Sequence, residues 1–146
     1  MNDHEQPGGG AAIPPGFEPR QAGLPFMEAV GPIYLRHEPG APSFGIRIEH
    51  RHCNAKMAAH GGMLASFADV VLGIGGLELA GVPGFFVTIT LTTDFVGPAP
   101  LGCWLECTPE LVRRTRSMMF VQGLFRADGK PALRASGVFA LPREPG

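Results

Sequence analysis

The sequence predicts an α+β fold in which a mostly antiparallel sheet surrounds one long central helix. Over residues 60–79, apolar side chains recur at helical spacing with almost no charge among them, which is typical of a buried helix. Five shorter segments alternate apolar and polar residues, the pattern of strands with one buried face. The last four follow one another over short connections, so we expect neighbouring strands to run antiparallel.

The sequence predicts an N-terminal arm followed by one domain. Residues 1–24 are rich in Gly, Pro and Ala without apolar periodicity, so we expect a disordered or loosely attached N-terminal arm there. Residues 25–146 are expected to form the only domain, because 146 residues are too few for two ordinary cores. Residues 24–35 predict a short helical turn and then an extended segment, with Gly31-Pro32 as the break.

The remaining elements follow from the alternation of side chains. In residues 43–50, Phe44, Ile46 and Ile48 alternate with glycine or charged residues, which predicts a strand before the helix. Because the helix is apolar on nearly all sides, one sheet cannot cover it, and we expect a second subunit to complete its packing. The strands predicted after the helix lie at 85–96, 103–112, 118–126 and 132–141.

Composition limits the class of partner. With 45% hydrophobic and 17% charged residues and a net charge of -1, the chain looks like a folded soluble protein without special affinity for nucleic acid or membranes. The N-terminus lacks the pattern of a signal peptide, so we expect a cytoplasmic protein. Cys53, Cys103 and Cys107 have no metal-ligand spacing, so we interpret them as reduced core residues and expect no metal site.

One acid, Asp69, lies in the middle of the apolar helix. A buried carboxylate is costly unless it has a partner. The plain alternative is a side chain that points to solvent or pairs with a base, but no Lys or Arg occurs between Met57 and Val112. We therefore interpret Asp69 as a base or nucleophile kept in a water-poor pocket.

The helix begins at the tripeptide His60-Gly61-Gly62. The first N–H groups of a helix lack intrahelical acceptors and lie at the positive end of its dipole, so they can hold a developing oxyanion. Glycine there lets a substrate carbonyl approach the backbone. Taken alone, the tripeptide equally suits a tight strand-to-helix turn, and Asn54, six residues before His60, equally suits a loop.

Together these residues resemble a known family. Asn54, His60-Gly61-Gly62 and Asp69 are similar to the Asn, His-Gly-Gly and Asp motif of hot-dog-fold acyl-CoA thioesterases, in the phenylacetyl-CoA thioesterase-like branch of the 4-hydroxybenzoyl-CoA thioesterase superfamily. Residues 81–102 look like the family's next strand and its Pro-Ala-x-x-Gly turn, with Thr88 where that branch often has Ser or Thr. The order of predicted elements also fits this family.

The resemblance implies a hot-dog fold, no cofactor, and hydrolysis of an acyl-CoA thioester to a free acid and coenzyme A. The Gly61 amide and the Asn54 side chain would polarise the thioester carbonyl, while Asp69 activates water or attacks directly. Thr88 would help to place that water. The family also implies a homodimer, often paired again into a homotetramer. The substrate contacts implied are those of His60 and Gly62.

Helix geometry predicts a shared active site. Asp69 follows His60 by nine residues, which corresponds to about 13.5 Å along one helix and, at about 100° per residue, to opposite sides of it. One helix therefore cannot present the Gly61 amide and the Asp69 carboxylate to the same thioester carbon. An antiparallel helix from a two-fold partner can bring its own Asp69 beside the first helix's N-terminus.

The basic residues suggest where the nucleotide binds. Six of the twelve Lys and Arg fall between residues 113 and 134, where Asp128 is the only acid. Arginine suits the phosphates of coenzyme A, and we expect a contact at Arg114 or Arg116 first. The alternative is a solvated hairpin end.

Two other functions stay open at this point. A non-catalytic hot-dog domain could bind an acyl-CoA as a sensor or scaffold, although binding alone gains nothing from a buried Asp69. A hot-dog hydratase or dehydratase would need a differently placed Asp and His pair. The acyl group is not predicted, because the residues that would suit an aryl or medium-chain pocket are also ordinary core residues: Met63, Phe67, Phe85, Phe86 and Phe95.

Overall fold

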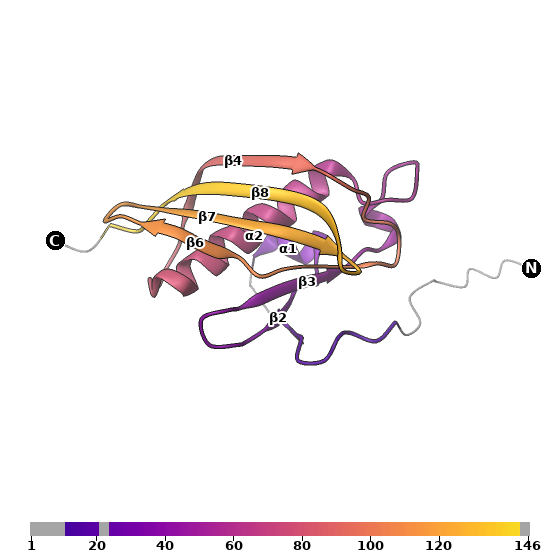
Figure 1. The fold of residues 1–146 in the computed structure, drawn as a ribbon, viewed down its shortest axis with the longest axis horizontal. Coiled ribbons are helices and arrows are strands. Elements are labelled where there is room, and N and C mark those ends of the chain that lie inside the picture. Colours follow the sequence, from indigo (N-terminus) through magenta and orange to yellow (C-terminus); the bar gives the residue numbers. More distant parts are fainter. Residues whose placement is uncertain (1–10, 21–23, 144–146) are drawn as a thin grey trace, which may run out of the picture.

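The computed structural model describes residues 11–20 and 24–143. An eight-stranded antiparallel sheet curves around one long helix, α2 (Gly61–Ala80), as Figure 1 shows. The α+β fold predicted from the sequence, a sheet wrapped around one central helix, is confirmed.

The strands follow the order β1-β2-β3-β5-β7-β8-β4 across the sheet, and β6 pairs with β7 outside this path. A short helix, α1 (Pro25–Val30), and one turn of 3-10 helix, η1 (His50–His52), precede α2. The strands are β1 (Glu18–Pro19), β2 (Tyr34–Arg36), β3 (Ser43–Arg47), β4 (Val87–Phe95), β5 (Trp104–Cys107), β6 (Glu110–Arg114), β7 (Met118–Ala127) and β8 (Lys130–Ala140).

Two predicted segments differ from the structure. The strand expected over 103–112 is two strands, β5 and β6, because Pro109 lacks the N–H that a central ladder needs. The loosely attached arm expected over 1–24 is wrong for residues 11–20. Phe17 is buried, with its ring centroid 5.1 Å from that of Trp104, and β1 pairs with β2. Residues 1–10 and 21–23 of that arm lie outside the described part.

The core lies between α2 and the inward face of β7 and β8. Large side chains of α2, among them Phe67, Val71 and Leu72, have no measurable solvent exposure. Burying each contributes about 1.5–3 kcal/mol to folding. By length and composition α2 could also cross a membrane, but more than half of it is buried inside the fold, so its apolar side chains already have a protein environment.

The C-terminal half of α2 approaches its neighbours closely through glycines. A Cβ on Gly73 would lie 2.2 Å from the Phe86 ring, and one on Gly76 would lie 2.7 Å from Val121 Cγ2. No real side chain tolerates such distances, so these glycines let the helix and the sheet approach. The C-terminal half of α2 is therefore in close contact with its neighbours in the fold.

The cysteines of β5 and its preceding turn behave as core residues. Cys103 and Cys107 are buried, and burial raises the pKa of both thiols to about 12. Cys53 is only partly buried, and burial raises its pKa as well. All three are free thiols, as the sequence predicted.

Candidate active site

The start of α2 leaves the N–H groups of Gly61 and Met63 without acceptors among the described residues. His60 is the N-cap, and its Nδ1 accepts a hydrogen bond from the Gly62 N–H at 2.9 Å. The His60 N–H donates to the His52 carbonyl oxygen at 2.8 Å. Between these two satisfied groups, the Gly61 N–H has no acceptor among the described residues. A donor at the positive end of the helix dipole is therefore available to an anion.

Gly61 and Gly62 are glycines for different reasons. A Cβ on Gly62 would lie 3.1 Å from His60 Nδ1, so glycine there belongs to the cap. A Cβ on Gly61 would lie 3.6 Å from the Phe95 ring, an ordinary van der Waals distance, and the Gly61 φ is not in the left-handed region. Nothing in the described part of the chain requires Gly61 to lack a side chain.

The loop that precedes the helix fixes the Asn54 side chain. Its Oδ1 accepts from the Lys56 N–H at 3.0 Å and from the Ala58 N–H at 3.4 Å, the local pattern of an Asx turn. This turn uses the oxygen of the amide, and within the described part of the chain its Nδ2 donates to no acceptor. Asn54 is exposed, so Nδ2 can donate outward.

Asp69 is partly buried and tied to the sheet. Thr88 Oγ1, on β4, donates to Asp69 Oδ1 at 2.7 Å. The pairing of β4 with β8 shifts between Thr88 and Thr90, an irregularity of the bulge type that re-aims side chains near functional sites. In the described ranges no Lys or Arg forms an ion pair with Asp69. The alternative that Asp69 pairs with a basic side chain is therefore not supported.

Gly61 and Asp69 stay apart within one chain. Both lie on α2, eight residues apart, which is about 12 Å along the helix axis.

Two hollows in the surface involve neither Gly61 nor Asp69. One, of about 680 Å³, lies over the outward side chains of β7, β8 and β4, and one, of about 430 Å³, lies between α1 and α2.

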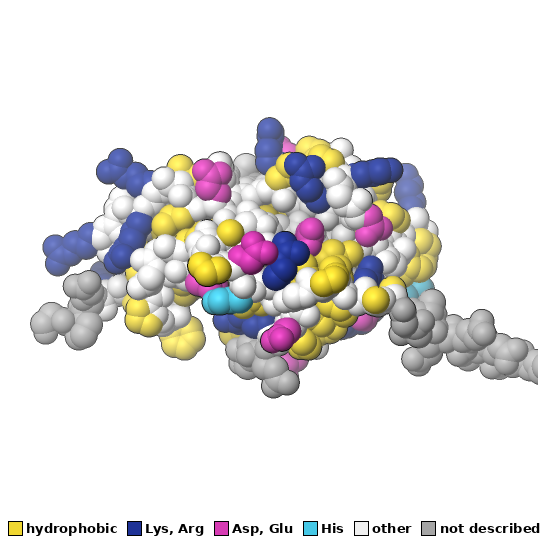
Figure 2. Space-filling model, turned by 60° about the horizontal axis from the view of Figure 1, so that its bottom comes forward, with side chains coloured by type: hydrophobic (Ala, Val, Ile, Leu, Met, Phe, Trp, Pro, Cys, Tyr) yellow, Lys and Arg dark blue, Asp and Glu magenta, His cyan; other side chains and the backbone are white. Residues whose placement is uncertain are grey.

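The basic residues are not gathered. Arg114 Nη1 donates to the Ala80 carbonyl oxygen at 3.0 Å, at the C-terminal end of α2, about 30 Å along the helix from Gly61. Arg116 is exposed in the turn after β6, whereas Lys130 lies at the opposite end of β7. On the face shown in Figure 2, Lys and Arg side chains are dispersed, with acids among them. A phosphate contact at Arg114 or Arg116 stays a prediction.

The aromatic residues considered for the acyl pocket also separate. Phe67 is fully buried, and Phe86 packs edge-on against Phe139 with ring centroids 5.3 Å apart. Phe85 and Phe95, by contrast, are exposed just before β4 and at its end. Met63 is partly buried on α2.

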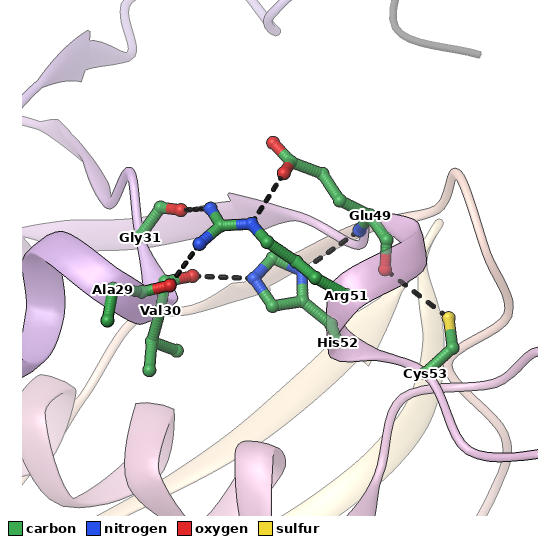
Figure 3. Close-up of polar contacts among 7 residues, drawn as sticks. All are labelled: Ala29, Val30, Gly31, Glu49, Arg51, His52 and Cys53. Atoms are coloured by element: carbon green, nitrogen blue, oxygen red, sulfur yellow. Dashed lines mark hydrogen bonds and ion pairs between the residues drawn. The ribbon is translucent and has the colours of Figure 1, made fainter. Parts of the chain in front are cut away.

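Sequence reasoning missed a buried histidine next to this loop. His52 is only 4% exposed and contacts the end of α1 (Figure 3). Its neighbours His50 and Arg51 make the local sequence look like a solvated basic turn, and no apolar periodicity marks His52 as buried. Burial lowers the pKa of the His52 imidazole below its usual 6.5, and the Val30 carbonyl oxygen acts in the opposite direction.

Comparison with known proteins assigns the chain to a family. A model of the thioesterase superfamily matches residues 58–132, the stretch that contains the start of α2, Asp69 and Thr88. A Pseudomonas aeruginosa protein named "Putative esterase PA0474" is 34% identical over 131 residues, which cover 89% of this chain and 98% of that protein.

Solved structures give the same fold. A mutant of the phenylacetic acid degradation protein PaaI from Thermus thermophilus is 23% identical, with a TM-score of 0.69, over 82% of this chain and all of that one. A hypothetical thioesterase from Streptococcus pneumoniae, solved with coenzyme A, is 17% identical, with a TM-score of 0.67, over 78% of this chain and 88% of that one. These likenesses support the hot-dog fold, and the family model and the Pseudomonas relative show that the chain belongs to the thioesterase superfamily.

Proposed function

We propose that this chain hydrolyses an acyl-CoA to a free acid and coenzyme A, in an active site shared between two copies of the chain. The carrying observation is that α2 presents two groups without a partner among the described residues: the Gly61 N–H, which has no acceptor, and Asp69, which has no basic partner. The esterase name of the Pseudomonas relative and the coenzyme A in the Streptococcus structure support the substrate class.

The reaction needs few groups. Water adds to the thioester carbonyl carbon, the carbonyl oxygen becomes an oxyanion, and the carbon–sulfur bond then breaks to release coenzyme A as its thiol. The Gly61 N–H and Asn54 Nδ2 would donate to that oxygen. Asp69 would take the proton from the attacking water and pass it to the leaving sulfur. In the direct route its carboxylate would attack the carbon and expel coenzyme A, and water would then hydrolyse the mixed anhydride and supply the proton of the thiol. In both routes the Thr88 hydroxyl holds the carboxylate in place.

A second copy would bring these groups together. Because about 12 Å of helix separates Gly61 from Asp69, the acid that acts beside one Gly61 is assigned to the partner's helix. The strand β4, which carries Thr88, is the last strand of the sheet order. Its side chains include exposed apolar ones, Val87 at 67% and Phe95 at 53%, and an exposed apolar edge strand invites a partner.

Replacement of Asp69 tests the proposal most directly. Asp69→Asn keeps the shape of the side chain and its contact with Thr88, and should lower kcat for acyl-CoA hydrolysis at least about 100-fold, the scale of a lost general base. Activity is followed as free thiol released from a panel of acyl-CoAs. The matched control is Glu78→Gln, an exposed acid on the same helix, which should leave kcat unchanged. A folded Asp69→Asn protein with full activity would rule out the mechanism.

Mixing two inactive variants tests the shared site. Asp69→Ala and Asn54→Ala subunits that exchange freely should form heterodimers with one intact site and recover roughly a quarter of wild-type activity under random two-fold pairing. If no activity returns despite verified exchange, both residues act within one chain.

The alternative of a non-catalytic acyl-CoA-binding domain makes a different prediction. It would bind acyl-CoA without releasing thiol, and Asp69→Asn would bind as well as the wild type. Measuring binding and thiol release on the same preparation separates the two functions.

A further inference from the structure

Two hydrogen bonds connect His52 to the residues around the candidate oxyanion donor, one between backbone groups and one accepted by the His60 ring. The His52 carbonyl oxygen accepts from the His60 N–H at 2.8 Å, and the His60 ring in turn accepts from the Gly62 N–H at 2.9 Å. These bonds hold the peptide units on either side of the unit that carries the Gly61 N–H, and the carbonyl oxygen of that unit, from His60, accepts from the Leu64 N–H at 3.0 Å. The His52 main chain is thus one of the groups that fix the direction of the Gly61 N–H.

The ring of His52 fixes that main chain from the other side. Its Nδ1 accepts from the Glu49 N–H at 2.9 Å, so Nε2 must carry the proton and donate to the Val30 carbonyl oxygen at 2.5 Å (Figure 3). Both bonds are satisfied at once only by the neutral ring. A second proton, on Nδ1, would face the Glu49 N–H and break that bond.

The charged groups around the ring are on its own turn. Arg51 donates to the carbonyl oxygens of Ala29 and Gly31 and pairs with Glu49 at 2.9 Å, so α1 stays attached through Arg51 when the His52 ring changes. The end of α1 presents a backbone carbonyl to the ring and no charge. We therefore expect loss of the hydrogen bonds of the His52 ring to change mainly the position of the loop over residues 53–60.

We propose that His52 is a positioning residue: its neutral, buried ring sets the direction of the Gly61 N–H through the His60 peptide, and protonation of this ring releases it. The proposal rests on the role of Gly61 in the proposed function. On this proposal, part of the fall in kcat toward low pH comes from protonation of His52, and this part is separate from the protonation of Asp69. A misdirected donor weakens binding of the oxyanion and leaves substrate binding almost unchanged, so the effect should fall on kcat and not on KM.

Two variants separate the polar role of the ring from its volume. His52→Leu keeps apolar volume and loses both hydrogen bonds, and should lower kcat at least about tenfold, a fraction of the loss expected for removing an oxyanion donor, with KM within about twofold. His52→Gln retains one acceptor and one donor without titrating, and should restore kcat and remove the His52 component of the acid limb. His50→Gln, the exposed histidine of the same turn, is the control and should change neither.

An NMR measurement keeps the test independent of catalysis. In the unliganded wild-type protein, the amide resonance of Gly61 should shift with the titration of the His52 ring, and in His52→Gln this shift should vanish. A Gly61 amide that ignores the His52 titration would overturn the proposal even if the protein is an active thioesterase. A Gly61 amide that follows it in a protein without thioesterase activity would leave the coupling intact and refute only the proposed function.

Discussion

The two halves of α2 use glycine in opposite ways. At the C-terminal half, Gly73 and Gly76 are required by neighbours in the same chain, because any Cβ would collide with Phe86 or Val121. At the N-terminus, Gly61 has room for a Cβ and still lacks one. The difference teaches that packing within the chain accounts for the glycines of the C-terminal half, whereas packing among the described residues does not account for Gly61.

A substitution in the closely packed half should have the largest effect on stability. Gly76→Ala would place a Cβ 2.7 Å from Val121 Cγ2, and overpacking of this kind costs about 1–3 kcal/mol, partly offset by about 1 kcal/mol of helix propensity. We expect a net loss of up to about 2 kcal/mol in the free energy of unfolding, measured by urea denaturation. Unchanged or greater stability would contradict the packing argument.

The same substitution at the N-terminus should act on activity instead. Gly61→Ala should leave stability unchanged or raise it by up to about 0.5–1 kcal/mol, since alanine is the better helix former. It should also lower kcat at least about tenfold, which corresponds to about 1.4 kcal/mol, because the methyl group crowds the oxyanion position. Gly62→Ala is the matched control: it presses on the His60 ring, so it should lower stability. Gly61→Ala with wild-type kcat would remove the distinction between the two halves.

The smallest effects are expected at the far end of the helix. Arg114→Ala removes a cation and a hydrogen bond from the Ala80 carbonyl oxygen and should cost about 0.3–1 kcal/mol of stability, whereas the exposed Arg116→Ala should cost almost nothing. If either arginine binds the nucleotide, its loss raises KM for acyl-CoA more than KM for a truncated thioester. Equal changes in KM for both substrates would restrict Arg114 to a structural role.

Much of the architecture could be predicted because it depends on periodicity. The helix was expected at 60–79 and lies at Gly61–Ala80, and the hairpin strands agree closely with their predicted ranges. Pro109, visible in the sequence, indicates that the strand predicted over 103–112 is interrupted. The burial of Phe17 carried none, because it depends on a ring of Trp104 that lies far away in sequence.

The candidate site was predictable in composition and less so in arrangement. The contact between Asp69 and Thr88 brings together two residues that the motif placed in the same site. The spread of the basic residues could not be foreseen, because nearness in sequence does not tell which end of a long hairpin a side chain occupies. His52 was missed because burial of a histidine depends on the backbone groups that enclose it, and one of these, the Val30 carbonyl, comes from the distant α1.

The packing of Phe17 on Trp104 has a practical consequence. Trp104 is the only tryptophan in the chain, and its ring packs against those of Phe17 and Tyr34. The indole N–H of Trp104 donates a hydrogen bond to the Glu106 carboxylate at 3.1 Å. Its fluorescence emission should therefore shift to longer wavelength when residues 11–20 leave the sheet and water reaches the indole. Because Trp104 lies on the face of the sheet away from α2, this optical signal would follow the N-terminal segment without responding to events at Gly61 or Asp69.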